Sequence, residues 1–360
     1  MKSSASWDAW RRLGSPRYVV APMVDASELA FRDLTRKYGA DLAYTPMLNS
    51  KIFARDAKYR LEHFTTHPAD RPLAAQFCAN DPALLVEAAR HVQDHVDAVD
   101  LNLGCPQGIA RKGHYGSFLQ DEWNLLHDIV STAARDLTVP IWCKIRIFPT
   151  VERTVEYAKM LECAGASLLA VHGRTREQKG KDAPPADWEA IRAVKRAVSI
   201  PVIANGNVRC KADADHAIQS TEAEGVMSAW ALLDNPAAFN KEGETAPSRM
   251  QLAMEYLDLA EKYNTPMRIV RLHIFKLFRS RLDVNMDLNE EVAKCRCLND
   301  FRQIADTLAA RTDFDGVLFE TRVQLGTVPE NVVSEKKAKR LKKALEASAL
   351  EQHRRKQKGV

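Results

Sequence analysis

Asp100-Leu-Asn-Leu-Gly-Cys-Pro106 ends a short apolar strand with a cysteine at the start of a glycine-rich loop. Gly104 tolerates a sharp turn and Pro106 prevents the strand from continuing, so the Cys105 thiol is presented rather than packed away. The loop over 107–116 contains three glycines and the basic side chains Arg111 and Lys112, which predicts a mobile lid for an anionic partner. By position alone, a buried hydrophobic cysteine is the alternative interpretation.

Apolar segments of this kind recur along the chain, with helical segments between them. Strands that are apolar on both faces and separated by helices indicate a parallel sheet. Eight such strands predict an α/β fold, a (β/α)8 TIM barrel, with an open doubly wound sheet as the alternative because periodicity does not show closure. The predicted strands are 18–24, 42–48, 73–78, 98–104, 140–147, 167–173, 201–206 and 225–230, and the predicted helices are 27–38, 81–96, 122–135, 151–164, 187–198, 210–220 and 235–240.

Composition changes near residue 241, where a polar linker begins and strand signals cease. Apolar positions then recur at three- and four-residue spacing, which predicts helices over 249–263, 266–281 and 290–310. We therefore expect a smaller helical domain after the barrel and a flexible tail. The predicted parts are an N-terminal extension over 1–14, a barrel over 15–242 with a catalytic lid near 105–118, a helical domain over 243–325 and a basic tail over 326–360.

Positive charge is concentrated at the C-terminal end. Residues 335–360 contain ten Lys or Arg and three Glu, a net charge of +7, whereas the whole chain carries +5, so the remainder carries −2. Such a tail is typical of an arm that binds nucleic acid or of an import signal, and a solvated tail without a partner is the alternative.

Several classes of protein are disfavoured by composition. No run of ~18 apolar residues is present to span a bilayer, and the N-terminus lacks the apolar region of a secretory signal. Seven scattered cysteines show neither a disulfide framework nor zinc-ligand spacing. We therefore expect an intracellular protein, cytoplasmic and/or nuclear, that is a monomer without membrane attachment or metal.

Polar side chains stand at the predicted carboxyl ends of the strands, where barrel enzymes carry their chemistry. A buried amide, ammonium or imidazole needs a partner, and a bound polar ligand would supply one. The small-residue turns after strands seven and eight match the place where many barrels bind phosphate, which predicts a phosphorylated cofactor. The strand ends carry Ala21-Pro-Met-Val24, Gln76, Asn102, Cys105, Lys144, Arg146, His172-Gly-Arg-Thr175, Asn205-Gly-Asn207 and Gly225-Val-Met-Ser-Ala-Trp230.

The predicted helix over 266–281 has a basic face opposite an apolar stripe. Lysine and arginine on one face suit the phosphates of RNA, although any surface helix can carry charge in this way. The basic residues are Arg268, Arg271, Lys276 and Arg279, and the stripe is Val270, Ile274, Leu277 and Phe278.

Taken in barrel order, these motifs resemble the tRNA-dihydrouridine synthase family over about residues 15–310, most closely the eukaryotic branch for positions 16 and 17 of the D-loop. The resemblance implies FMN in the barrel, NADPH or NADH as reductant and tRNA as substrate. It implies reduction of the C5–C6 double bond of a uridine, with hydride from reduced FMN to C6 and a proton from Cys105 to C5.

The resemblance also implies a role for each side chain. Pro22, Met23 and Val24 would contact the flavin ring, Gln76 its polar edge and Lys144 its N1–C2 region, while His172 approaches it. Ribityl and phosphate would lie on Asn205, Gly206, Asn207, Ser228, Ala229 and Trp230, although many family members have Gly-Arg where this chain has Ala229-Trp230, which puts phosphate neutralisation in doubt. Asn102 and Arg174 would hold the target base, and Arg111, Lys112 and the basic helix would contact tRNA phosphates.

Three other functions remain open at this point. A flavoenzyme like dihydroorotate dehydrogenase would share barrel, FMN and cysteine but act on a free pyrimidine. A barrel aldolase would use Lys144 as a Schiff base. A non-catalytic RNA-binding barrel would keep the basic helix and tail without needing flavin.

Overall fold

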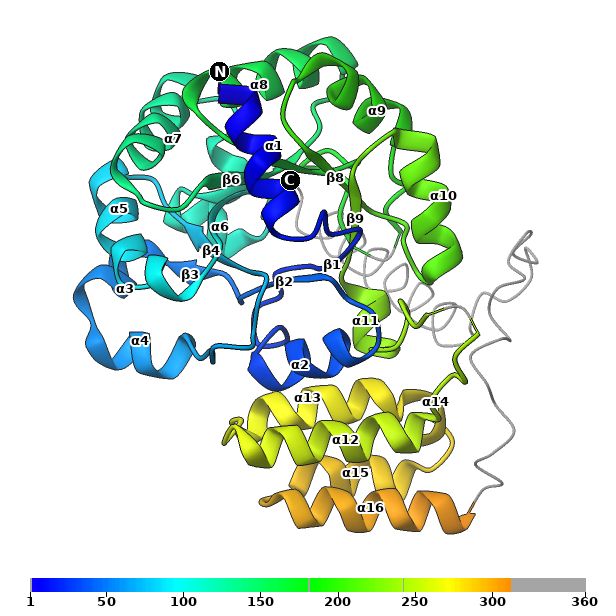
Figure 1. The fold of residues 1–360 in the computed structure, drawn as a ribbon. Coiled ribbons are helices and arrows are strands. Elements are labelled where there is room, and N and C mark those ends of the chain that lie inside the picture. The colour runs from blue at the N-terminus through cyan, green and yellow to red at the C-terminus, as the bar shows by residue number, and fades with distance from the viewer. Residues whose placement is uncertain (1, 181, 242, 312–360) are drawn as a thin grey trace, which may run out of the picture. The chain divides into compact units, whose positions relative to one another are not determined.

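The computed structural model describes residues 2–180, 182–241 and 243–311 of the 360-residue chain. Within them one parallel sheet runs in the order β2-β1-β9-β8-β7-β6-β5-β4-β3, and an additional β2–β4 pairing closes it into a ring (Figure 1). This closure confirms the TIM barrel and excludes the open sheet. The strands are β1 (Tyr18–Val20), β2 (Leu42–Tyr44), β3 (Leu48–Asn49), β4 (Leu73–Cys78), β5 (Ala98–Leu103), β6 (Ile141–Arg146), β7 (Leu169–His172), β8 (Val202–Asn205) and β9 (Gly225–Ser228).

The second predicted strand is interrupted. β2 pairs with the start of β4, and the two-residue β3 pairs with its end at Phe77 and Cys78. The interruption contains Pro46, which has no backbone N–H to give to a ladder. The chain between the two strands therefore forms a turn at the carboxyl end of the barrel.

Helices cover the outside of the barrel, and most of them lie within the predicted ranges. Asp81 is a representative cap, because its Oδ1 accepts from the Leu84 N–H at 2.9 Å and Pro82 begins the helix. The helices are α2 (Leu29–Lys37), α5 (Pro82–Arg90), α7 (Trp123–Asp136), α8 (Val151–Ala164), α9 (Trp188–Ala197) and α10 (Lys211–Thr221), with shorter, unpredicted ones at α3 (Ser50–Arg55), α4 (Ala57–His63) and α6 (Gly108–Gly113).

The helix predicted over 235–240 is wrong. The helix after β9 is α11 (Trp230–Asp234), and the chain then turns. Asn235 ends α11, and its Oδ1 accepts from the Ala237 N–H at 2.9 Å. Such a local bond from an asparagine side chain competes with helix and favours a turn.

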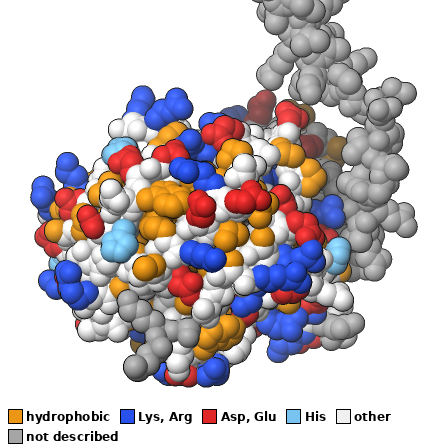
Figure 2. All heavy atoms as spheres, turned by 90° about the horizontal axis from the view of Figure 1, so that it is seen from above, with side chains coloured by type: hydrophobic (Ala, Val, Ile, Leu, Met, Phe, Trp, Pro, Cys, Tyr) orange, Lys and Arg blue, Asp and Glu red, His pale blue; other side chains and the backbone are white. Residues whose placement is uncertain are grey.

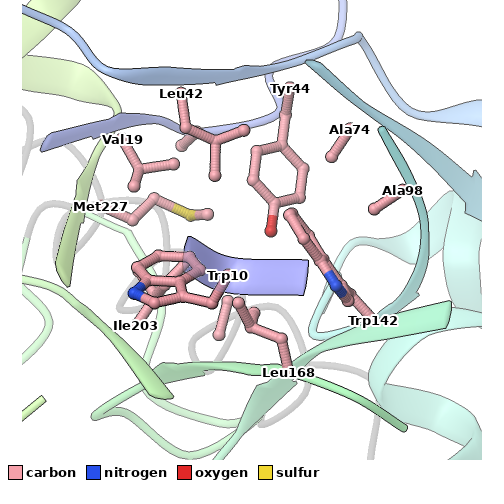
Figure 3. Close-up of a cluster of buried hydrophobic side chains, with 12 residues drawn as sticks. Trp10, Val19, Leu42, Tyr44, Ala74, Ala98, Trp142, Leu168, Ile203 and Met227 are labelled. Atoms are coloured by element: carbon pink, nitrogen blue, oxygen red, sulfur yellow. The ribbon is translucent and has the colours of Figure 1, made fainter. Parts of the chain in front are cut away.

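The N-terminal extension forms α1 (Lys2–Arg12) and closes the bottom of the barrel. Trp10 is buried among side chains that begin several strands, and Figure 3 shows them converging around it. The Trp7 indole N–H also donates to the Ser199 carbonyl at 2.7 Å. The amino end of the barrel is therefore filled by a tryptophan, which leaves the carboxyl end for a ligand. The cluster around Trp10 includes Val19, Leu42, Tyr44, Ala74, Ala98, Trp142, Leu168, Ile203 and Met227.

In the part of the chain that the structure describes, five helices follow the barrel, and α12 and α13 lie beside α2 (Figure 1). The buried Glu28 carboxylate joins the two parts, because it accepts from the Tyr256 hydroxyl at 2.8 Å and lies 3.1 Å from the His273 Nε2. The described residues belong to one compact unit, while the predicted domain boundaries stay a prediction. The helices are α12 (Arg249–Lys262), α13 (Met267–Leu277), α14 (Arg279–Leu282), α15 (Met286–Lys294) and α16 (Leu298–Arg311).

The helix predicted over 290–310 is two helices, α15 and α16. They are separated at Cys295–Cys297, where the Asp300 carboxylate accepts from the N–H groups of Arg296 and Cys297 at 2.6 and 3.0 Å. This is a side-chain cap, which starts a new helix rather than continuing the old one. The predicted tail over 326–360, with residues 312–325, lies outside the described residues.

The surface of the described part carries charges of both signs. On the face drawn in Figure 2, Lys and Arg side chains are interspersed with Asp and Glu. None of the helices in the described ranges combines the length and apolar character needed to cross a bilayer.

Candidate active site

Parallel pairing gathers the predicted polar side chains at the carboxyl end of the barrel. Asn102 is in register with Lys144, Arg146 with His172, and His172 with Asn205. Strands in register end at the same edge of the sheet, so groups far apart in sequence become neighbours. The structure thus brings together the candidate residues of β4 through β8.

Cys105 lies at this edge and is partly buried rather than sealed in the core. Its N–H donates to the Asn102 Oδ1 at 2.9 Å, and its carbonyl accepts from the Ser117 N–H at 3.1 Å. Gly116 has φ +68°, and a Cβ there would lie 2.8 Å from the Cys105 carbonyl oxygen. Only glycine allows this close approach. Gly116 of the predicted lid therefore packs directly against Cys105.

A series of hydrogen bonds between buried side chains holds the backbone at Cys105. The Gln76 amide donates to the Asp100 carboxylate at 2.8 Å, and the Asn102 amide donates to the Gln76 Oε1 at 2.8 Å. The Asn102 Oδ1 then accepts from the N–H groups of Gly104 and Cys105. In this arrangement Asn102 and Gln76 hold each other and the cysteine turn, and their predicted contacts with the base and the flavin edge stay predictions.

Asp100 is a site residue that was not predicted, although it belongs to the same segment as Cys105, residues 100–106. Burial raises the pKa of this carboxyl to about 7, and its Oδ1 has no hydrogen-bond partner among the described residues. A polar residue at a position facing the interior of an otherwise apolar strand is the signal that identifies it. The carboxylate orients Gln76 and, through it, Asn102.

We expect Asn102→Ala to cost about 2 kcal/mol of unfolding free energy, since it leaves the Gly104 and Cys105 N–H groups and the Gln76 Oε1 without this partner. Urea denaturation measures the loss. Asn80→Ala is the control, because the bond of this side chain to the Gly113 carbonyl is exposed to solvent. Equal stability of the two variants would contradict the anchoring role.

Lys144 and Arg146 place positive charge at the mouth. The Lys144 ammonium donates to the Asn205 Oδ1 at 3.0 Å, and burial, followed by the Arg146 charge, lowers its pKa to about 8. The Arg146 guanidinium donates to the carbonyl of Gly104 at 2.7 Å and to that of Thr175 at 2.8 Å. Arg146 therefore braces the cysteine turn, while Lys144 is a cation held by a neutral amide.

His172 is a neutral imidazole at physiological pH. Burial, together with the charges of Lys144, Arg146 and Arg174, lowers the pKa of His172 well below its ordinary value. Arg174 donates to the Asn207 Oδ1 at 2.7 Å and lies 3.3 Å from the His172 Nε2. The guanidinium predicted to hold the target base thus fixes the turn after β8.

The turns after β8 and β9 leave little room for side chains. Gly206 has φ +115°, and a Cβ there would meet the Ala186 Cβ at 2.7 Å. The buried Ser228 hydroxyl donates to the Val208 carbonyl at 2.7 Å. Trp230 is 71% exposed, and the Lys276 Nζ of α13 lies 4.2 Å from its ring centroid. A basic side chain therefore does reach the corner where the sequence lacks the family's arginine.

The first strand ends in an exposed apolar surface. Val24 is 60% exposed, and Pro22 and Met23 are partly exposed. The Ser27 hydroxyl accepts from the Met23 N–H at 3.0 Å and fixes this turn. Exposed valine beside a polar barrel mouth suits the face of an aromatic ligand.

The four basic residues of α13 and α14 do not form one open face. Arg268 pairs with Asp25 of the barrel at 2.5 Å, while Arg271 donates to the Val292 and Cys295 carbonyls at 3.2 and 2.6 Å. Lys276 covers Trp230 as described, and Arg279 is exposed. In the predicted lid, Lys112 is exposed and Arg111 lies over the Phe118 ring.

The donor set fits a phosphorylated aromatic cofactor. It offers an exposed apolar turn, an ammonium, a neutral imidazole and a glycine turn, and the described residues contain no cluster of three side chains suited to a metal ion. Fold and site together define a TIM-barrel enzyme with a thiol at the rim of a polar, cationic ligand site. The chain belongs to the dihydrouridine synthase (Dus) family, whose sequence pattern matches residues 19–312, and this confirms the family resemblance.

Relatives support this assignment. A tRNA-dihydrouridine(16/17) synthase-like protein of Mus musculus is 51% identical over 318 residues, which cover 88% of this chain and 66% of the relative. The tRNA-dihydrouridine(16/17) synthases of Schizosaccharomyces pombe and Saccharomyces cerevisiae are 41% and 44% identical, over 84% and 78% of this chain and 79% and 70% of their own lengths. The names of all three include NAD(P)(+).

Proposed function

We propose that this protein is a tRNA-dihydrouridine synthase that reduces the C5–C6 double bond of uridine in the D-loop of tRNA with NAD(P)H as reductant. The observation that carries this proposal is the partly exposed Cys105 at the rim of the cationic barrel mouth. Family membership and the names of the relatives support it, and those names favour positions 16 and 17. We further propose that the protein is a monomer and acts in the cytoplasm and/or the nucleus.

FMN is the cofactor that the donor set suits best. Val24, Met23 and Pro22 would border its ring, Lys144 and His172 its polar edge, and the turns at 205–207 and 228–230 its ribityl phosphate. When bound, FMN supplies the hydride that NAD(P)H provides. The Lys144 ammonium favours negative charge at this edge, and the neutral His172 is able to accept or donate a hydrogen bond.

Cys105 has the role of an acid. The Asn102 and Arg146 bonds to its turn hold the thiol at one position, from which it gives a proton to C5 of the base. The described residues within hydrogen-bond distance of this turn include no histidine base, which a nucleophilic thiolate would normally require. The uridine has to leave its stack to reach this thiol.

Binding of the tRNA backbone falls to the exposed cations. Arg111 and Lys112 of α6 and Arg279 beside α13 are exposed, so they are available to phosphates, and their contribution falls as salt rises. Arg268, Arg271 and Lys276 contact other parts of the protein, so they have a structural role besides the predicted contact with tRNA phosphates.

Mass mapping of dihydrouridine in tRNA from cells that lack this protein tests the proposal. We expect dihydrouridine to be absent at the affected D-loop position and restored by the wild-type protein. Purified protein is expected to be yellow after FMN addition and to reduce uridine in tRNA, but neither to reduce free orotate nor to oxidise free dihydroorotate. Reduction of a free pyrimidine alone would favour the dihydroorotate-dehydrogenase-like function, and colourless protein that still binds tRNA would favour the non-catalytic barrel.

A further inference from the structure

We propose that the cavity between the barrel and the α12–α13 connection binds a second nucleobase of the tRNA, the neighbour of the uridine that is being reduced. The inference rests on the proposed function and adds a second base site to it. The cavity has a volume of about 580 Å³. Its walls are the β1–α2 segment, the turn between β2 and β3, helix α4 and residues 263–269.

One packed cluster links the cavity to the catalytic thiol. Met47 lines it and also packs against the small cluster of Cys78, Ala110 and Tyr115, against which Cys105 packs. Val24, assigned to the flavin surface, lines it as well. A base in this cavity would therefore lie next to the base that reaches Cys105.

The buried charges in the cavity walls are balanced by protein partners, and Arg268 has a partner at the surface. Arg268 pairs with Asp25 at 2.5 Å, and the buried Arg32 pairs with Asp70 at 2.6 Å. Glu28 is engaged by His273 and Tyr256. Each of the two arginines in the described lining faces a carboxylate, so the cavity favours an uncharged group over a phosphate.

Apolar and hydrogen-bonding groups fill the rest of the lining. Leu61 is 79% exposed, and the Tyr59 ring lies against His63, with centroids 4.2 Å apart. Thr265 and Asn264 add small polar groups. Apolar or aromatic surface with a few polar groups is what a nucleobase requires, since it stacks on its face and bonds through its edge.

The identity of this base follows from the two positions in the relatives' names. An enzyme that acts at both 16 and 17 through one thiol has to move the loop by one nucleotide between the two reactions. Each time, the adjacent base lies beside the site and loses its own stacking partner. The cavity replaces that lost stacking.

Binding of full-length protein to tRNA with one uridine in the 16/17 pair tests this inference by fluorescence anisotropy. The neighbour is either a cytidine or an abasic residue. We expect the abasic residue to weaken wild-type binding about tenfold, and to weaken binding by Leu61→Asp less than twofold, because the base site is already lost. Val284→Asp is the matched control, since Val284 is 73% exposed, lies outside the cavity and receives the same charge.

An abasic penalty that is equal in wild type and Leu61→Asp, or absent from wild type, would overturn the second base site. The inference would also be overturned if Leu61→Asp reduced the abasic penalty only when the target uridine itself is the abasic residue, because the cavity would then hold the target. Dihydrouridine formation from the intact tRNA is measured separately. Its absence would refute the proposed reaction, whereas the coupling is read from affinity and does not require turnover.

Discussion

Cys105→Ala lowers the rate of dihydrouridine formation by an expected factor of about 10²–10⁴, the usual contribution of a positioned general acid. The thiol lies at the barrel rim, and its turn is held by Asn102 and Arg146. Binding of FMN and tRNA should persist, because this substitution removes only a small side chain. Single-turnover formation of dihydrouridine, followed by mass spectrometry, measures the effect on the chemical step.

Cys163→Ala is the control for this experiment, because Cys163 is an exposed cysteine of α8. It should retain wild-type activity. Turnover by Cys105→Ala within a factor of two of wild type would refute the proton-donor assignment. Loss of activity together with loss of FMN or tRNA binding would instead assign Cys105 to structure.

Lys144→Met is expected to lower the same rate by about 10²–10³-fold, since it removes a partly buried cation from the site where negative charge develops. The pKa of Lys144 is lowered to about 8, so the ammonium is present below pH 8 and is lost as pH rises through it. Wild-type activity should therefore decline above about pH 8. A pH–rate profile between pH 6 and 10, measured with saturating FMN, gives this alkaline limb.

Lys144→Arg separates the lysine from other titrating groups. A guanidinium keeps its charge across this range, so the decline should move to higher pH. Arg146 is not the source of a limb at pH 8, because burial lowers its pKa only to about 10. A limb that stays at pH 8 in Lys144→Arg would assign it to a different group, and Lys159→Met serves as the exposed-lysine control.

Local sequence was sufficient for most elements of the barrel. Apolar strands, helix caps such as Asp81 and glycine turns act through neighbouring residues, so their patterns are readable in the chain. The errors arose where a nearby side chain competes with regular structure. Asn235 and Asp300 each bond to backbone N–H groups and replace a predicted helix by a turn or by a new helix start.

Roles of individual site residues were harder to predict. Asn102, Gln76 and Arg174 lie at the predicted mouth of the barrel, and their side chains are engaged within the protein. Asn102 bonds to Gln76 and to the Cys105 N–H, and Arg174 bonds to the Asn207 side chain. The single helix predicted over 266–281 is two helices, α13 and α14, divided at Phe278, and its basic face is not open, because Arg271 and Arg268 are bound by α15 and by the barrel. A partner from another element is invisible to periodicity within one helix.

The sequence by itself determined the kind of barrel, the family and the thiol at its rim, because strand periodicity and the order of the motifs are properties of the chain. Only the tertiary structure decided ring closure through β2 and β4, the seating of Trp10 in the barrel bottom and the chain of bonds from Asp100 to Cys105. These depend on contacts between residues distant in sequence. Their energies come from burial and from mutual satisfaction of polar groups, which exist only once the chain is folded.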